Sequence, residues 1–268
     1  TFPQNWRFAS GATDNISMSQ MMYNGSAVFS LTGGENFIAT KTISETFYGG
    51  TSYTAWNMER VSSINQAFSR IGQVPNLNIG TWQITSALTN ANGAFQNYNQ
   101  YAGKQLIDQD LGHWDVTGIT SAGSFNQWMN NTAGNKLVEF STANYDSLLD
   151  ITDGWGQDAG SVQSGVSLNM GTSQYTATNV VQGTCNNTGT NNTSCNDYGN
   201  SPFVTAGVQV GDIAYNVTTG QYSKVLSIVF TGTGITTDQA IWSDGDTYRV
   251  ERSNAVKGRY ALVEAGWT

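Results

Sequence analysis

Basic residues are scarce in this 268-residue sequence, which contains 11 Lys and Arg against 19 Asp and Glu. The net charge of −8 argues against binding to nucleic-acid phosphates, because such binding requires clustered basic side chains. No apolar run approaches the roughly 18 residues that a membrane-spanning helix needs. With one histidine and two cysteines, the chain also offers few ligands for a zinc site. The sequence therefore predicts no nucleic-acid partner, no membrane span and no cofactor.

The two cysteines, Cys185 and Cys195, lie in the Asn- and Thr-rich stretch TCNNTGTNNTSCN. No histidine is close enough in the sequence to complete a metal site with them. We therefore expect a disulfide that closes a short loop, stabilises the fold by at most roughly 3 kcal/mol and forms under oxidising conditions. Two free thiols are the alternative.

Asn, Thr, Ser and Gly are abundant, and aromatic residues make up 12% of the chain. Uncharged polar residues combined with many aromatics are typical of proteins rich in strands and turns. The length is sufficient for one large domain or two ordinary ones with a real core. We expect a mainly β fold with short helices, in an extracellular or particle-surface protein.

Apolar residues recur about every third position after three tryptophans, Trp56, Trp82 and Trp114. The unit that begins at Trp114 has the clearest spacing, with apolar side chains at Val116, Ile119, Ala122 and Phe125. Five such units fit between residues 6 and 134. Each unit has a Met or Phe anchor, and these anchors are Met22, Phe47, Phe68, Phe95 and Phe125.

A three-residue step fits neither a regular strand nor a regular helix, but it is typical of a solenoid coil in which a strand leads into a helical half-turn. We expect the tryptophans, aliphatic residues and anchors to face inward, because stacked coils bury apolar edges that one coil cannot bury. Tyrosines interspersed with Asn and Gln follow the anchors. These tyrosines either pack between coils or form a flat surface for protein or glycan: Tyr23, Tyr48, Tyr53, Tyr98 and Tyr101.

The stretch WDVTGITSAGSFNQW (residues 114–128) resembles the repeat unit of BspA-like leucine-rich-repeat surface proteins. Residues 144–176 are similar to the segment that ends such arrays, and the final SNAVKGRYALVEAGWT is similar to its closing helix. The resemblance implies a leucine-rich-repeat-like solenoid over residues 1–176, a capping helix over 253–268 that returns to it, and no enzymatic activity.

Residues 177–252 separate these two parts and read as an inserted small β module that carries the cysteine loop. The runs DIAYNV, YSKVLSIVF and TYRV alternate like strands and are separated by glycine-containing turns. The stretch VGDIAYNVTTG (residues 210–220) resembles modules of bacteriophage virion structural proteins. This second resemblance implies a β module that projects near the end of the solenoid.

Few residues suggest catalysis or metal binding. His113 lies beside Asp115, but a Ser–His–Asp triad requires a presented serine, and no G-x-S-x-G motif occurs. Asp150 and Asp153 are the carboxylates that a glycosidase would use, although they fall in the array-ending segment. Asp244 and Asp246 in SDGD suit either a Ca²⁺ ion or a tight turn, and we favour the turn.

We expect a non-enzymatic virion structural protein, either a capsid decoration or a fibre or tail appendage, exposed on the virion surface. Its expected partners are further copies of itself, for which a trimer suits, other virion proteins, and a host surface protein or glycan. Thr1 also fits a chain that lost only an initiator methionine, which favours particle assembly over secretion. The alternative is a bacterial cell-surface leucine-rich-repeat adhesin. A polysaccharide-degrading tail enzyme ranks below both.

Overall fold

The computed structural model describes residues 138–168, 170–187, 189–199, 202–229 and 231–268 of the later part of the chain. Before residue 138 it describes 62–65, 80, 82–94, 109–119, 122–125 and 128, and the backbone of short strands. These residues form a mainly β structure that contains one antiparallel six-stranded sheet and a few short helices. The mainly β class with short helices, predicted from the composition, is therefore confirmed.

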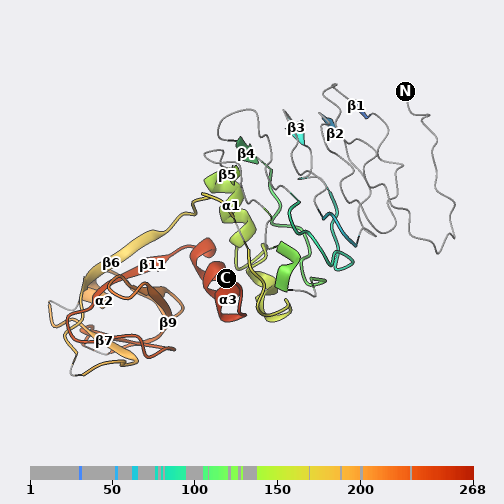
Figure 1. The fold of residues 1–268 in the computed structure, drawn as a ribbon. Coiled ribbons are helices and arrows are strands. Elements are labelled where there is room, and N and C mark those ends of the chain that lie inside the picture. Colours follow the sequence, from blue (N-terminus) through green and yellow to red (C-terminus); the bar gives the residue numbers. More distant parts are fainter. Residues whose placement is uncertain are drawn as a thin grey trace.

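Five described short strands, all before residue 141, pair in parallel (Figure 1). They form one three-stranded sheet and one two-stranded sheet: β1 (Ser30–Leu31), β2 (Ser52–Tyr53) and β3 (Asn76–Leu77), then β4 (Gln105–Ile107) and β5 (Val138–Phe140). Their first residues are separated by 22, 24, 29 and 33 positions, so the chain makes a long connection between one strand and the next. Each strand follows one of the five anchors by 5 to 13 residues.

Two of the tryptophan units contact each other at matching positions. The rings of Trp82 and Trp114 are both buried and stack with centroids 6.4 Å apart and planes 5° apart. The Asp115 N–H, one position after Trp114, donates to the Ile84 carbonyl, two positions after Trp82, at 3.3 Å. The two units therefore lie side by side, with the tryptophans at the same position and the hydrogen-bonded backbone groups offset by one residue.

The next unit toward the N-terminus makes the same kind of contact. Ile64 is eight residues after Trp56 and Asn90 is eight residues after Trp82. The Ile64 N–H donates to the Asn90 carbonyl at 2.9 Å, and Ser63 and Asn90 form a parallel β-bridge. Backbone hydrogen bonds thus join each of three consecutive units to the next.

Two helices complete this part of the molecule. Helix α1 (Thr142–Leu149) begins at Ser141, whose hydroxyl accepts a hydrogen bond from the Asn144 N–H, and it is followed by a short 3-10 turn, η4 (Gln157–Gly160). Helix α3 (Asn254–Glu264) packs against both elements. The chain beyond α3 runs beside residues 165–168, because the Thr268 N–H donates to the Val166 carbonyl and the Leu168 N–H donates to Thr268.

The antiparallel sheet is built by the segment between these helices. Its strands lie in the order β6-β11-β8-β9-β10-β7, and a single-turn helix, α2 (Pro202–Thr205), lies beside them. The strands are β6 (Thr178–Thr184), β7 (Ser194–Asn196), β8 (Ile213–Asn216), β9 (Gln221–Ile228), β10 (Gly234–Thr237) and β11 (Thr247–Arg252). Gly220, with φ of 77°, allows the tight turn from β8 to β9.

The buried residues divide into two main clusters. One contains Trp82, Trp114, Phe125 and residues of α1, and it extends to Leu262 and Trp267 at the C-terminal end. The other lies within residues 185–250 and is centred on Trp242 and neighbouring aromatic and aliphatic side chains. Helix α3 takes part in the first cluster with one face. With another face it contacts β8, where Ile213, Val256 and Tyr260 form a small third cluster.

Candidate functional site

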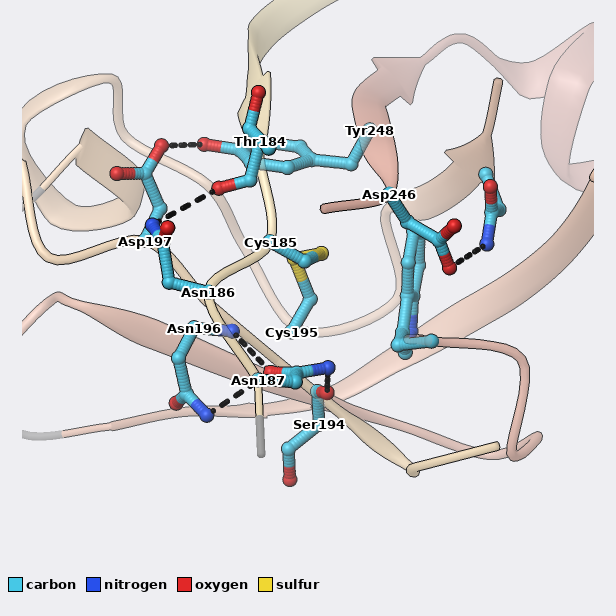
Figure 2. The surroundings of a disulfide bond; sticks show 12 residues. Thr184, Cys185, Asn186, Asn187, Ser194, Cys195, Asn196, Asp197, Asp246 and Tyr248 are labelled. Atoms are coloured by element: carbon cyan, nitrogen blue, oxygen red, sulfur yellow. Dashed lines mark hydrogen bonds between the residues drawn. A yellow bond between two sulfur atoms is a disulfide. The ribbon is translucent and has the colours of Figure 1, made fainter. Parts of the chain in front are cut away.

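The disulfide between Cys185 and Cys195 links the two edge strands of the six-stranded sheet (Figure 2). Cys185 directly follows β6, and Cys195 lies within β7. Both cysteines are completely buried, and the Asn186 N–H donates to the Asn196 carbonyl at 2.6 Å across the same junction. The sheet therefore curls until its edges meet, which protects them from pairing with other chains.

A buried asparagine replaces backbone hydrogen bonds at this junction. Asn187 is only 6% exposed, and its side chain donates to the Ser194 carbonyl at 2.7 Å. Its amide oxygen accepts hydrogen bonds from the backbone and side-chain nitrogens of Asn196, at 3.1 and 3.2 Å. The Asn-rich loop between the cysteines is thus an ordered part of the module's closure at these positions (Figure 2).

Removal of the disulfide is expected to destabilise the β module. A Cys185→Ala/Cys195→Ala variant should lose about 3 kcal/mol of unfolding free energy, because the cross-link closes a short loop and restrains the unfolded chain. Urea denaturation followed by the indole N–H signal of Trp242 in a proton–nitrogen correlation spectrum measures the change, because Trp242 lies in the module's core and its signal is separate from those of the other tryptophans. Reductant should shift the wild-type midpoint to that of the variant and leave the variant unchanged; equal midpoints in all samples would contradict a structural role for the bond.

Buried tyrosines hold hydrogen bonds in and around the module. The Tyr248 hydroxyl donates to Asp197 at 2.8 Å, and the Tyr260 hydroxyl donates to both carboxylate oxygens of Asp238 at 2.9 Å. Burial raises the pKa of each tyrosine well above its usual value, and the neighbouring carboxylate raises it further. Burial and the hydroxyl of Tyr175 likewise raise the pKa of Tyr222.

Alkaline pH is therefore expected to unfold this part of the protein. Unfolded tyrosine loses its proton near pH 10, whereas folded Tyr222, Tyr248 and Tyr260 retain it. The stabilisation is complete below about pH 10 and is lost as the pH rises further, because the unfolded state then binds fewer protons than the folded state. Urea midpoints measured between neutral pH and pH 11 should fall steeply above pH 10, and less steeply in Tyr248→Phe. Parallel curves for the two proteins would contradict the assignment.

Two ion pairs lie near α3. Arg252 forms a two-pronged interaction with Asp212, with N–O distances of 2.7 and 2.6 Å, and Asp212 is completely buried. Arg249 pairs with Glu251, which is 1% exposed. The Arg252–Asp212 pair fixes β11 against the loop that precedes β8, whereas Arg249 and Glu251 pair within β11 itself.

A small pocket lies between α1, α3 and the C-terminal segment. Its volume is about 160 Å³, and Leu149, Leu168, Met170 and Leu262 form apolar walls. Tyr145, Arg259 and Trp267 also line it. The Tyr145 ring packs edge-on against the Tyr175 ring, with centroids 6.1 Å apart. Thr268 also lines the pocket, which thus combines apolar walls with one cation, one phenol and this polar residue.

The candidate residues for catalysis make local hydrogen bonds. The His113 ring nitrogen Nε2 lies 3.0 Å from the Trp82 carbonyl, which joins two tryptophan units. Asp115 accepts hydrogen bonds from the amide and hydroxyl of Thr117. Burial acts to raise the pKa of Asp150, but hydrogen bonds from Thr152 and Asn254 hold it below its usual value.

The SDGD turn is held by Asp246. Its carboxylate accepts hydrogen bonds from the Ser243 amide at 2.7 Å and the Asn216 side chain at 2.8 Å, while Asp244 is exposed. Within the described ranges, no group of three or more His, Cys, Asp or Glu side chains is arranged to hold a metal. A Ca²⁺ ion at Asp244 and Asp246 stays a prediction.

Several predicted residues lie outside the described residues. These are Trp56, the anchors Phe47, Phe68 and Phe95, and the tyrosines Tyr23, Tyr48, Tyr98 and Tyr101. Tyr53 belongs to β2, of which the backbone is described. Phe125 is completely buried and packs against Trp128, Trp155 and Trp267.

Among the described helices, none is long and apolar enough to cross a membrane.

The sequence did not reveal the group formed by Arg259, Tyr175 and Tyr222. The Arg259 guanidinium lies 4.9 Å from the ring centre of Tyr222 and 5.8 Å from that of Tyr175. These residues come from three distant segments, so no short motif could have marked them.

Comparison with protein-family models, curated proteins and solved structures finds no match to this chain.

Proposed function

We propose that the protein is a non-enzymatic structural component of a virion, either a capsid decoration or a fibre or tail appendage. In this proposal, residues 1–176 form a leucine-rich-repeat-like solenoid of the BspA-like type. Residues 177–252 are an inserted β module, and residues 253–268 return to cap the solenoid. The protein serves as a rigid, surface-exposed scaffold for subunit assembly and for adhesion to a host surface.

The in-register contact between tryptophan units is the observation that carries this proposal. Trp82 stacks on Trp114, and the backbone bonds from Asp115 to Ile84 and from Ile64 to Asn90 join positions of successive units that are equivalent or one residue apart. Parallel strands that recur once per unit support the same arrangement. In such a stack the tryptophans are buried between neighbouring units, where they support the fold. Buried in this way, they are not available to bind or react with a substrate.

Exposed apolar residues on the module support a role in assembly. Tyr198 is 69% exposed, Val210 65% and Val204 55%, and all three lie in the segment between β7 and β8. Contiguous exposed apolar patches on a monomer mark contact sites, and we propose that these three side chains belong to one such patch. We therefore place contacts with further copies of the chain or with other virion proteins at this segment.

Immunogold electron microscopy tests the proposal. An antibody against the chain is applied to cells that carry its gene and to particles released from them. Gold on the particles is the expected result, whereas gold on the envelope of cells that release no particles would overturn the proposal in favour of a cell-surface adhesin. Partial digestion of labelled particles distinguishes a capsid position from a fibre or tail position.

A second measurement addresses the enzyme alternative. The purified protein is incubated with polysaccharide from the cells that the particles infect, and released reducing ends are counted. No release is expected. Release that Asp150→Asn or Asp153→Asn abolishes would overturn the non-enzymatic assignment, because glycoside hydrolysis depends on paired carboxylates.

A further inference from the structure

Arg259 on α3 has no protein hydrogen-bond acceptor among the residues that the structure describes. Within the described part of the chain, its guanidinium makes cation–π contacts with the rings of Tyr222 and Tyr175, at 4.9 and 5.8 Å, and no hydrogen bond or ion pair. A guanidinium carries five N–H donors in a fixed plane. The two rings thus hold Arg259 in place without using its donors.

The neighbouring acidic groups are already engaged. Glu251 pairs with Arg249. Glu264, further along α3, accepts a hydrogen bond from the Gln239 side chain at 2.5 Å. Neither carboxylate forms an ion pair with Arg259 among the described residues, so its guanidinium can receive an external anion.

Arg259 also lines the pocket between α1 and α3. Its charge acts to lower the pKa of the Tyr145 hydroxyl, although burial has the larger effect and raises it. The charge of Arg259 therefore acts on a hydroxyl group that lines the same pocket. The remaining walls are largely apolar, with Leu149, Leu262 and Met170 among them.

We propose that this pocket binds a small organic monocarboxylate. Its apolar part, of the size of a phenyl ring, fills the space between the leucines, and its carboxylate lies against Arg259 with the Tyr145 hydroxyl as a second donor. A volume of about 160 Å³ fits this class, because apolar cavities of about 150 Å³ bind benzene. A planar guanidinium matches a carboxylate with two parallel hydrogen bonds. The site is separate from the assembly role and does not depend on it.

Hydrocinnamate, a phenyl-bearing carboxylate, is the probe, and its neutral amide is the matched control. Titration into the full chain is followed by the indole N–H signal of Trp267 in a proton–nitrogen correlation spectrum, because Trp267 lines the pocket. A dissociation constant of about 1 mM is expected for the acid, in keeping with its few atoms. The amide should bind at least tenfold more weakly. Equal binding of acid and amide, or no shift of the Trp267 signal, would overturn the proposal.

Two variants locate the site. Arg259→Gln should weaken the acid to the level of the amide and leave the affinity of the amide unchanged. Val263→Phe adds a ring at the pocket rim, where Val263 is 45% exposed, and should abolish binding of both probes without lowering the melting temperature. Unchanged binding of the acid in either variant would contradict the proposal. If Arg259→Gln folds poorly, the Val263→Phe variant still tests it.

Discussion

Replacement of Gly258 by alanine is expected to lower the free energy of unfolding by about 3–5 kcal/mol. A β-carbon at this position would lie 1.6 Å from the Leu149 carbonyl oxygen, so α3 would have to move away from the end of α1. Helix propensity alone favours alanine over glycine by about 1 kcal/mol. The sign of the effect therefore separates close helix packing from an isolated helix.

The measurement is urea denaturation followed by far-ultraviolet circular dichroism. Gly160→Ala is the matched control, because no atom lies within 4 Å of the β-carbon that it adds. That variant should stay within about 0.5 kcal/mol of wild type. Stabilisation by Gly258→Ala, or equal effects of the two substitutions, would mean that α3 does not pack against α1 in the way described.

The β module illustrates what local patterns can predict. Alternating apolar residues in DIAYNV, YSKVLSIVF and TYRV predicted strands where β8, β9 and β11 lie. The partner of β11 was not predictable in the same way. Its Arg252 pairs with Thr178 of β6, more than seventy positions earlier, and a period-two pattern specifies which face is buried but not which strand lies alongside.

Helix α3 shows why the pocket escaped sequence analysis. Its buried residues include Ala255 and Leu262, which join the first cluster, and Val256 and Tyr260, which join the third. A helix that packs on two sides lacks the single apolar stripe from which a buried face is usually inferred. The cation of Arg259 then reads as an ordinary surface charge, because its aromatic partners are supplied by distant segments.

The three-residue step predicted more of the first cluster. Val116, Ile119 and Phe125 follow Trp114 at the expected positions, and all are at most 1% exposed. The step did not predict how closely successive units approach. The distance between units depends on backbone contacts. Here it depends on Gly118, which is not one of the apolar residues of the three-residue step.

Gly118→Ala is the second substitution with a large expected effect. Gly118 is four residues after Trp114, and Ser86 is four residues after Trp82. A β-carbon on Gly118 would lie 1.8 Å from the Ser86 carbonyl oxygen and 2.6 Å from that of Leu88. Both obstacles are backbone atoms, so a side-chain rotation cannot relieve the clash. We expect a loss of about 3–5 kcal/mol in unfolding free energy, again against Gly160→Ala as the control.

Hydrogen exchange makes this substitution a test of stacking rather than of stability alone. The Asp115 N–H bonds to the Ile84 carbonyl across the two units, and the Tyr145 N–H bonds to the Ser141 carbonyl within α1. If Gly118→Ala separates the units, exchange at Asp115 accelerates by more than exchange at Tyr145. Equal acceleration at both amides would indicate general destabilisation, and unchanged exchange at Asp115 would show that the two tryptophan units do not rely on each other. Equal acceleration at both amides, or unchanged exchange at Asp115, would remove the main support for a stacked scaffold. The reason to assign a structural role to the tryptophans would then be lost as well.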